Sequence, residues 1–149
     1  MIDSKFVVRE ERFDNAADID HRVRAAPPEA QGSLRTALSY LYLAGGPVNL
    51  PRERLKMAEL FVEPHERLLL RWLYTRTNGN LRSTYGAKAL IAARTSRYRC
   101  CRCGFADVRA LHIDHIDGRT TDTECSCLCA NCHNIKSREK DWSGEKRYE

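Results

Sequence analysis

The first two-thirds of the chain carries apolar residues at the three- and four-residue spacing of amphipathic helices. The clearest stripe runs from Leu34 to Leu41. It predicts a helix that starts at an N-cap on Ser33 and ends at the Gly45-Gly46 pair. Two prolines and a glycine predict a linker over residues 25–32, before that helix. Further helices are predicted at 51–61, from Pro64 to the Asn78-Gly79 pair, and at 81–94, and a short strand is predicted at 5–8.

The pattern changes in the last third of the chain. Val108, Ala110, Leu111 and Ile113 indicate a strand, and Asp117-Gly118 indicates a turn. Residues 123–128 then form the returning strand, and a helix opens at Cys129. The sequence therefore predicts an α+β protein, with a helical N-terminal region (1–80) of unknown role followed by a C-terminal unit (81–149) of two strands and a helix.

The cysteines give this C-terminal unit a candidate metal site. All seven lie between Cys100 and Cys132. Two C-x-x-C pairs, Cys100/Cys103 and Cys129/Cys132, are separated by 25 residues. A tight turn brings positions i and i+3 together, and four thiolates in a tetrahedron suit a structural Zn²⁺. Cys101 is the poorer partner for Cys103, because its spacing is shorter.

Cysteines used for metal rather than for disulfides are typical of a reducing compartment. The N-terminus has early acidic residues and no apolar stretch like that of a signal peptide. The longest apolar runs are far too short to span a bilayer. We therefore expect a cytoplasmic protein without membrane contact. The other two cysteines, Cys125 and Cys127, alternate with their neighbours as on a strand and are expected to pack as small apolar groups.

Charge is distributed unevenly along the chain. Residues 67–106 contain nine basic side chains and no acidic one, whereas the segments on either side are net acidic. A polyanion such as DNA is one partner that would require this. A basic surface that serves solubility, or that pairs with the acidic N-terminal region, is the alternative.

Three motifs in order, RYRCCRCG, LHIDHIDG and LCANCHNIK, resemble the HNH family of ββα-metal endonucleases. The resemblance implies a DNA endonuclease that leaves 5′-phosphate and 3′-hydroxyl ends. It assigns the water-activating base to His115, and imidazole does titrate in the range that such a base needs. It assigns the catalytic divalent metal to Asp114 and His133. An oxygen and nitrogen ligand set of this kind suits Mg²⁺ or a transition metal such as Mn²⁺.

One position departs from the family pattern. The second strand usually carries an asparagine five residues before the third zinc cysteine, and here that residue is Glu124. A carboxylate accepts hydrogen bonds but donates none unless it is protonated. Two roles for Glu124 are open: it orients His115, or it approaches the catalytic metal.

The remaining histidines and several basic residues have separate expected positions. His112 lies two residues before Asp114 and shares its strand face. His21 and His65 belong to no motif and are expected on the surface. The candidates for DNA contacts are basic residues on both sides of the motifs: Arg94, Arg97, Arg99, Arg119, Lys136 and Arg138.

Two other functions remain open from the sequence. The C-terminal unit could be a catalytically weak zinc module that binds nucleic acid, with Glu124 marking a lost activity. It could also belong to an accessory nuclease subunit whose N-terminal helices bind a protein partner in a larger complex. The oligomeric state is not indicated by any pattern in the chain.

Overall fold

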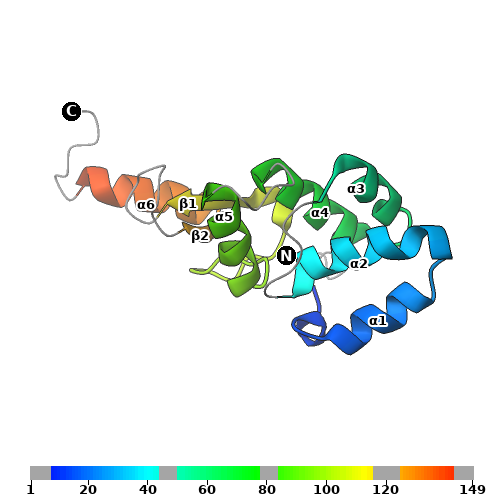
Figure 1. Ribbon diagram of the computed structural model, residues 1–149. Helices are drawn as coiled ribbons and strands as arrows, with labels where there is room; N and C mark the ends of the chain where they lie inside the picture. Colours follow the sequence, from blue (N-terminus) through cyan, green and yellow to red (C-terminus); the bar gives the residue numbers. More distant parts are fainter. Residues whose placement is uncertain (1–7, 44–49, 78–83, 116–124, 143–149) are drawn as a thin grey trace.

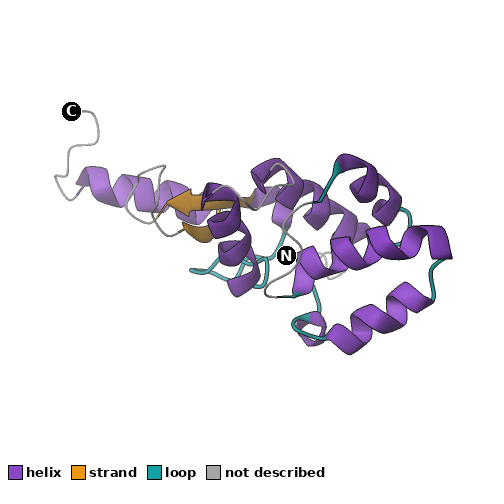
Figure 2. Ribbon diagram, in the orientation of Figure 1, coloured by secondary structure: helices purple, strands orange, loops and turns teal. Residues whose placement is uncertain are grey.

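The computed structural model describes residues 8–43, 50–77, 84–115 and 125–142, except for the side chains of 76–77, 84–89, 115, 125 and 140–142. Helices α1 to α4 gather at one end of the molecule, and a two-stranded sheet with α6 lies at the other (Figures 1 and 2). The mixed α+β class is confirmed. The elements are α1 (Ala16–Arg24), α2 (Pro28–Tyr42), α3 (Arg52–Glu59), α4 (Pro64–Thr77), α5 (Thr84–Thr95), β1 (Leu111–His115), β2 (Cys125–Cys129) and α6 (Ala130–Trp142).

The N-terminal quarter contains more helix than the pattern predicted. The linker prediction for residues 25–32 is wrong beyond Pro27, because α2 starts at Pro28. A proline suits the first position of a helix, where the missing N–H has no partner to lose. Helix α1 was not predicted; the side chain of Asn15 caps it by accepting a hydrogen bond from the backbone N–H of Asp18 at 3.0 Å. Of the expected strand at 5–8, only Val8 lies within the described residues, and it belongs to no strand.

Helix α2 ends at Tyr42, inside the protein, where its last carbonyl groups cannot reach water. Such groups need partners from elsewhere in the chain. Arg94 of α5 donates from Nε to the carbonyl of Tyr40 and from a terminal nitrogen to that of Ser39, at 2.8 and 2.9 Å. The hydroxyl of Tyr98 donates to the carbonyl of Leu41 at 2.6 Å. The second half of the chain thus caps a helix of the first half, and a cation is also favourable at this negative end of a helix.

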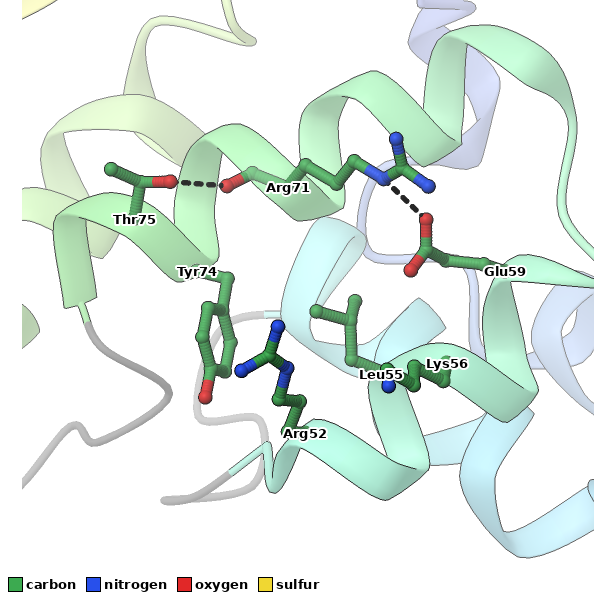
Figure 3. A pocket seen from close by; sticks show the side chains of 7 residues that line it. All are labelled: Arg52, Leu55, Lys56, Glu59, Arg71, Tyr74 and Thr75. Carbon is green, nitrogen blue, oxygen red and sulfur yellow. Dashed lines mark hydrogen bonds and ion pairs between the residues drawn. The ribbon is translucent and has the colours of Figure 1, made fainter.

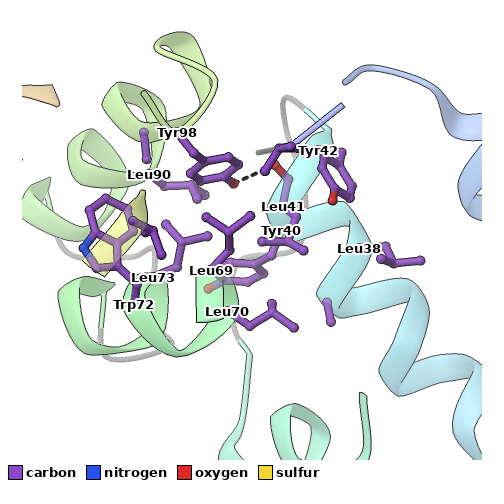
Figure 4. Close-up of a cluster of buried hydrophobic side chains, with 14 of the residues drawn as sticks. Leu38, Tyr40, Leu41, Tyr42, Leu69, Leu70, Trp72, Leu73, Leu90 and Tyr98 are labelled. Carbon is purple, nitrogen blue, oxygen red and sulfur yellow. Dashed lines mark hydrogen bonds between the residues drawn. The ribbon is translucent and has the colours of Figure 1, made fainter. Parts of the chain in front are cut away.

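The buried apolar side chains form one continuous cluster that runs from the N-terminal helices to the sheet. Leucines of α2 and α4 occupy its centre and meet Leu90 and Tyr98 from the second half of the chain (Figure 4). Leu38, Leu41 and Leu70 are completely buried. Burying a side chain of this size stabilises a fold by about 1.5–3 kcal/mol. The predicted boundary near residue 80 stays a prediction, since the core continues across it.

Strands β1 and β2 are antiparallel, with Leu111 opposite Cys129 and Asp114 opposite Ser126. The sequence placed the first strand three residues too early, because residues 108–110 form a 3-10 turn that the side chain of Asp107 caps at the N–H of Arg109. Trp72 of α4 donates from Nε1 to the carbonyl of Leu111 at 3.1 Å. Both α5 and α6 pack on this sheet, so that it is anchored to the helical part and also carries the C-terminal helix.

A buried ion network joins α1, α2 and α4. Glu66 of α4 is completely buried. Its carboxylate accepts hydrogen bonds from Arg12 at 2.8 Å, from Arg22 at 2.9 and 2.5 Å, and from the hydroxyl of Tyr42. Burial alone would raise the pKa of Glu66, but the hydrogen bonds and charge of Arg22 lower it to about 2. The carboxylate is therefore held ionised inside the protein by its partners.

Replacing Glu66 by glutamine should lower the free energy of unfolding at about pH 7 by about 3–5 kcal/mol, because two arginines lose their buried partner. The folded pKa of about 2 lies below the ordinary value of 4.5. The contribution is therefore complete above about pH 4.5 and is lost progressively as the pH falls toward 2. Urea unfolding of both proteins at about pH 7 and about pH 3.5 measures this difference.

Glu29→Gln, at an exposed position in the first turn of α2, is the matched control and should change stability little at either pH. A Glu66→Gln deficit of the same size at both pH values would contradict the assigned pKa.

Candidate metal centre

The four cysteines of the two C-x-x-C pairs come together as predicted. Cys100 and Cys103 lie in the turn that follows α5, Cys129 ends β2, and Cys132 lies in the first turn of α6. All four sulfur atoms lie within 4.8 Å of one another, and the Sγ atoms of Cys103 and Cys129 are 3.7 Å apart. In a tetrahedral zinc site with Zn–S bonds of about 2.3 Å, sulfurs lie about 3.8 Å apart. The cluster therefore has the size and donor set of a four-thiolate zinc site.

The local backbone explains why this spacing forms a cluster. Gly104 has a φ of +79°, a conformation that suits glycine, and its N–H donates to the carbonyl of Cys100 at 2.9 Å. The N–H of Cys132 donates to the sulfur of Cys129 at 3.4 Å. Burial opposes ionisation of Cys100, but hydrogen bonds from backbone groups outweigh it and lower the pKa of this thiol to about 6. A thiolate is the form that binds metal.

The cysteines outside the cluster lie in different environments. Cys101 is exposed, and its pKa is raised by desolvation and by the neighbouring Cys100. Its N–H donates to the carbonyl of Cys127 at 2.9 Å, so its backbone is fixed to β2. Cys127 is buried in the core, as expected of a strand cysteine that packs as an apolar residue. The side chain of Cys125 lies outside the described residues.

A second group of side chains meets between β1 and α6. Nε2 of His133 lies 3.2 Å from Oδ1 of Asp114, and Nζ of Lys136 forms an ion pair with Oδ2 of the same carboxylate. The ring of His112 stacks on that of His133, with centroids 5.6 Å apart and planes 3° from parallel. His112 and Asp114 therefore share one strand face, as expected. The sequence did not predict the ion pair between Asp114 and Lys136.

The cysteine cluster, which clamps the end of β2 to the start of α6, determines where this second group forms. Helix α6 starts at Ala130, directly after a cysteine of the cluster, and His133 comes directly after another. The register places Asp114 beside Ser126, two residues into β2. An oxygen and an imidazole nitrogen, both ligands for divalent metals, thus lie in contact at the start of α6.

Glu124 and Arg119 lie outside the described residues, as does the side chain of His115. The backbone of His115 ends β1, opposite Cys125.

The predicted DNA-contacting arginines occupy different environments. The guanidinium of Arg94 is directed into the protein, onto α2, and desolvation lowers its pKa. Arg97 forms an ion pair with Glu10 at 3.3 Å and lies over the ring of Phe13. Arg99 reaches the carbonyl of Val8 at 3.5 Å, and both Arg97 and Arg99 are half-buried. Arg138 on α6 is exposed.

His65 corrects one expectation, because it is buried rather than on the surface. Desolvation lowers its pKa, and its Nε2 lies 3.5 Å from the carboxylate of Glu63. Glu63, His65 and Glu66 present ligand atoms within 4.8 Å of one another. Arg12 already pairs with both carboxylates at 2.8 Å, so this group is an ion network and not a cation site.

No protein-family model, curated protein or solved structure matches this chain. Among the described residues, no helix is long and apolar enough to cross a membrane.

Zinc should be present at one ion per chain in protein purified without chelators. Cys103→Ser should lose the zinc and lower the melting temperature of the C-terminal unit, because a structural zinc contributes folding free energy directly. Cys101→Ser is the matched control, since it changes a neighbouring exposed thiol outside the cluster. Elemental analysis together with thermal melting measures both effects. Equal zinc loss in the two variants would contradict the assignment of the four ligands.

Proposed function

We propose that this protein is a metal-dependent endonuclease that hydrolyses phosphodiester bonds of DNA with an HNH-type ββα site. The observation that carries the proposal is the contact between Asp114 of β1 and His133 of α6, at 3.2 Å, on two strands and a helix clamped by four cysteines. The three motifs that resemble HNH endonucleases fall on this arrangement in the same order.

The side chains present fit a catalytic divalent metal. Asp114 and His133 would hold it, and a mixed oxygen and nitrogen set accommodates Mg²⁺ or Mn²⁺. Such a cation supplies Lewis-acid stabilisation of the charge that develops on the phosphate. The four-thiolate site would hold a separate Zn²⁺ with a structural role, because it leaves no open position for a substrate.

The chain itself would supply the proton transfer. His115 directly follows Asp114 at the end of β1, and we assign it the role of accepting the proton of the attacking water. Lys136, whose Nζ contacts the carboxylate of Asp114, would contact the phosphate of the substrate.

The proposed DNA-binding surface consists of basic residues whose side chains are exposed or half-exposed. Arg138 is exposed on the helix that carries His133. Arg97 and Arg99 are half-exposed after α5, beside the first cysteine pair. Arg94 is left out of the proposed surface, because its donors are used on the carbonyls of α2.

A non-catalytic zinc module that binds nucleic acid is the second candidate. The ion pair between Lys136 and Asp114 favours it, because this pair occupies the carboxylate that a metal needs. In that case the same basic residues would bind DNA without cleaving it.

The arginines after α5 allow a test of the DNA surface. The double variant Arg97→Ala/Arg99→Ala should weaken DNA binding and reduce the slope of log affinity against log salt by about 2, one for each lost phosphate contact. Arg94→Ala should leave that slope unchanged but lower the free energy of unfolding by about 2 kcal/mol, because the carbonyls of Tyr40 and Ser39 each lose a hydrogen bond from a guanidinium. Salt-dependent binding and urea unfolding distinguish the two effects. If Arg94→Ala changed the salt slope instead, its assignment as a structural residue would be wrong.

Plasmid cleavage with added Mg²⁺ or Mn²⁺ tests the activity itself. His115→Ala should reduce the rate by about 10²–10⁴-fold, the usual cost of removing a general base, with zinc content and DNA binding unchanged. Asp114→Ala should also lose activity, and part of that loss should return at high metal concentration because the defect is weaker metal binding. His133→Ala should behave like Asp114→Ala.

His21→Ala, at an exposed position on α1, is the control for removing a histidine. Cleavage by His115→Ala at the wild-type rate would refute the assigned base. Wild-type protein that binds DNA but never cleaves it would leave the non-catalytic module as the function.

A further inference from the structure

A pocket of about 440 Å³ lies between α3 and α4 (Figure 3). These two helices lie at the opposite end of the molecule from the sheet and α6 (Figure 1). Its size is in the range of small-molecule sites. Helix α3 packs on α2, and α4 also packs on α2, so the two helices leave a space between them. The lining residues are Arg52, Leu55, Lys56, Glu59, Arg71, Tyr74 and Thr75.

The charge of the pocket is positive. Arg52 and Lys56 lie four residues apart on one face of α3, and both are exposed. Among the described residues, neither forms an ion pair. The single carboxylate of the lining, Glu59, is already paired with Arg71, from Oε2 to Nε at 2.5 Å (Figure 3). Two cations are therefore available to an anionic ligand without losing an internal partner.

The rest of the lining is apolar and aromatic. Leu55 is buried, and Figure 3 shows it between the two cationic side chains of α3 and the helix opposite. Tyr74 is half-buried and extends from α4 toward Arg52 (Figure 3). The ring of Tyr74 and the two cations of α3 together favour a ligand that combines a negative charge with an aromatic system.

We propose that this pocket binds a nucleotide unit, with its phosphate on Arg52 and Lys56 and its base against Tyr74 and Leu55. Free phosphate alone would make no use of the half-exposed ring of Tyr74, and an apolar ligand would leave Arg52 and Lys56 without a counter-charge. The same chemistry is offered by a free mononucleotide and by one nucleotide of a single strand. The inference goes beyond the proposed nuclease function and does not depend on it.

Titration calorimetry on the full, zinc-loaded chain tests the pocket with three probes: dAMP, inorganic phosphate and a short single-stranded oligonucleotide. Arg52→Ala/Lys56→Ala should weaken the binding of dAMP or of the oligonucleotide by at least about tenfold, because charge-assisted contacts to the phosphate are lost. Tyr74→Leu should weaken the same probe by about tenfold, because the stacking surface is lost. It should leave the affinity for inorganic phosphate unchanged.

The matched control is Arg24→Ala/Arg35→Ala, which removes the same charge from exposed positions on α1 and α2. It should change dAMP binding less than twofold. Thermal melting of each variant verifies that the fold is retained, which is expected since Arg52 and Lys56 are exposed.

The probes also distinguish the two sources. Binding of dAMP that depends on Arg52, Lys56 and Tyr74 supports a site for a free nucleotide. The same dependence seen only with the oligonucleotide supports a site for a strand. The proposal is overturned if the Arg52→Ala/Lys56→Ala variant binds dAMP and the oligonucleotide no more weakly than the control variant does. It is also overturned if Tyr74→Leu binds both probes with wild-type affinity.

Failure of this site and failure of the nuclease proposal are separable. Plasmid cleavage tests His115, whereas dAMP titration compares Arg52, Lys56 and Tyr74 with the control pair, so a negative result in one assay leaves the other standing.

Discussion

The contact between four thiol groups is the constraint on which the candidate site depends. Two strands of five residues each cannot hold themselves together in water. The cluster joins the turn after α5, the end of β2 and the start of α6, so that one bound ion would fix three segments at once. His133 and Asp114 then meet because α6, which carries His133, starts at this cluster, and β1, which carries Asp114, pairs with β2. An ion bound there would therefore also stabilise the contact between His133 and Asp114.

The clamp is not isolated from the helical part of the molecule. The buried end of α2 takes its hydrogen-bond donors from Arg94 and Tyr98, and Trp72 of α4 donates to the backbone at the start of β1. These contacts are short, largely buried and made to backbone carbonyls, which need hydrogen-bond partners inside a protein. The N-terminal helices therefore support the sheet directly, and the two parts share one core.

Charge serves two separate purposes in this chain. Inside the protein, Arg12 and Arg22 hold the carboxylate of Glu66 ionised, a contact that costs desolvation and is stable only with all partners in place. Outside, basic residues remain exposed on α3 and α6. The net charge of residues 67–106 does not show this division. Arg94 belongs to the interior, whereas Arg97 and Arg99 lie nearer the surface.

The sequence by itself determined the features that depend on near neighbours along the chain. The C-x-x-C spacing predicted the cysteine cluster, and the order of strand, strand and helix was predicted correctly, because turns and helix phases are set within a few residues. Only the tertiary structure decided that His65 is buried and that Arg94 caps a distant helix. These outcomes depend on residues far apart in the chain, whose meeting is set by packing and by the demand of buried carbonyls for donors, and no local pattern encodes that demand.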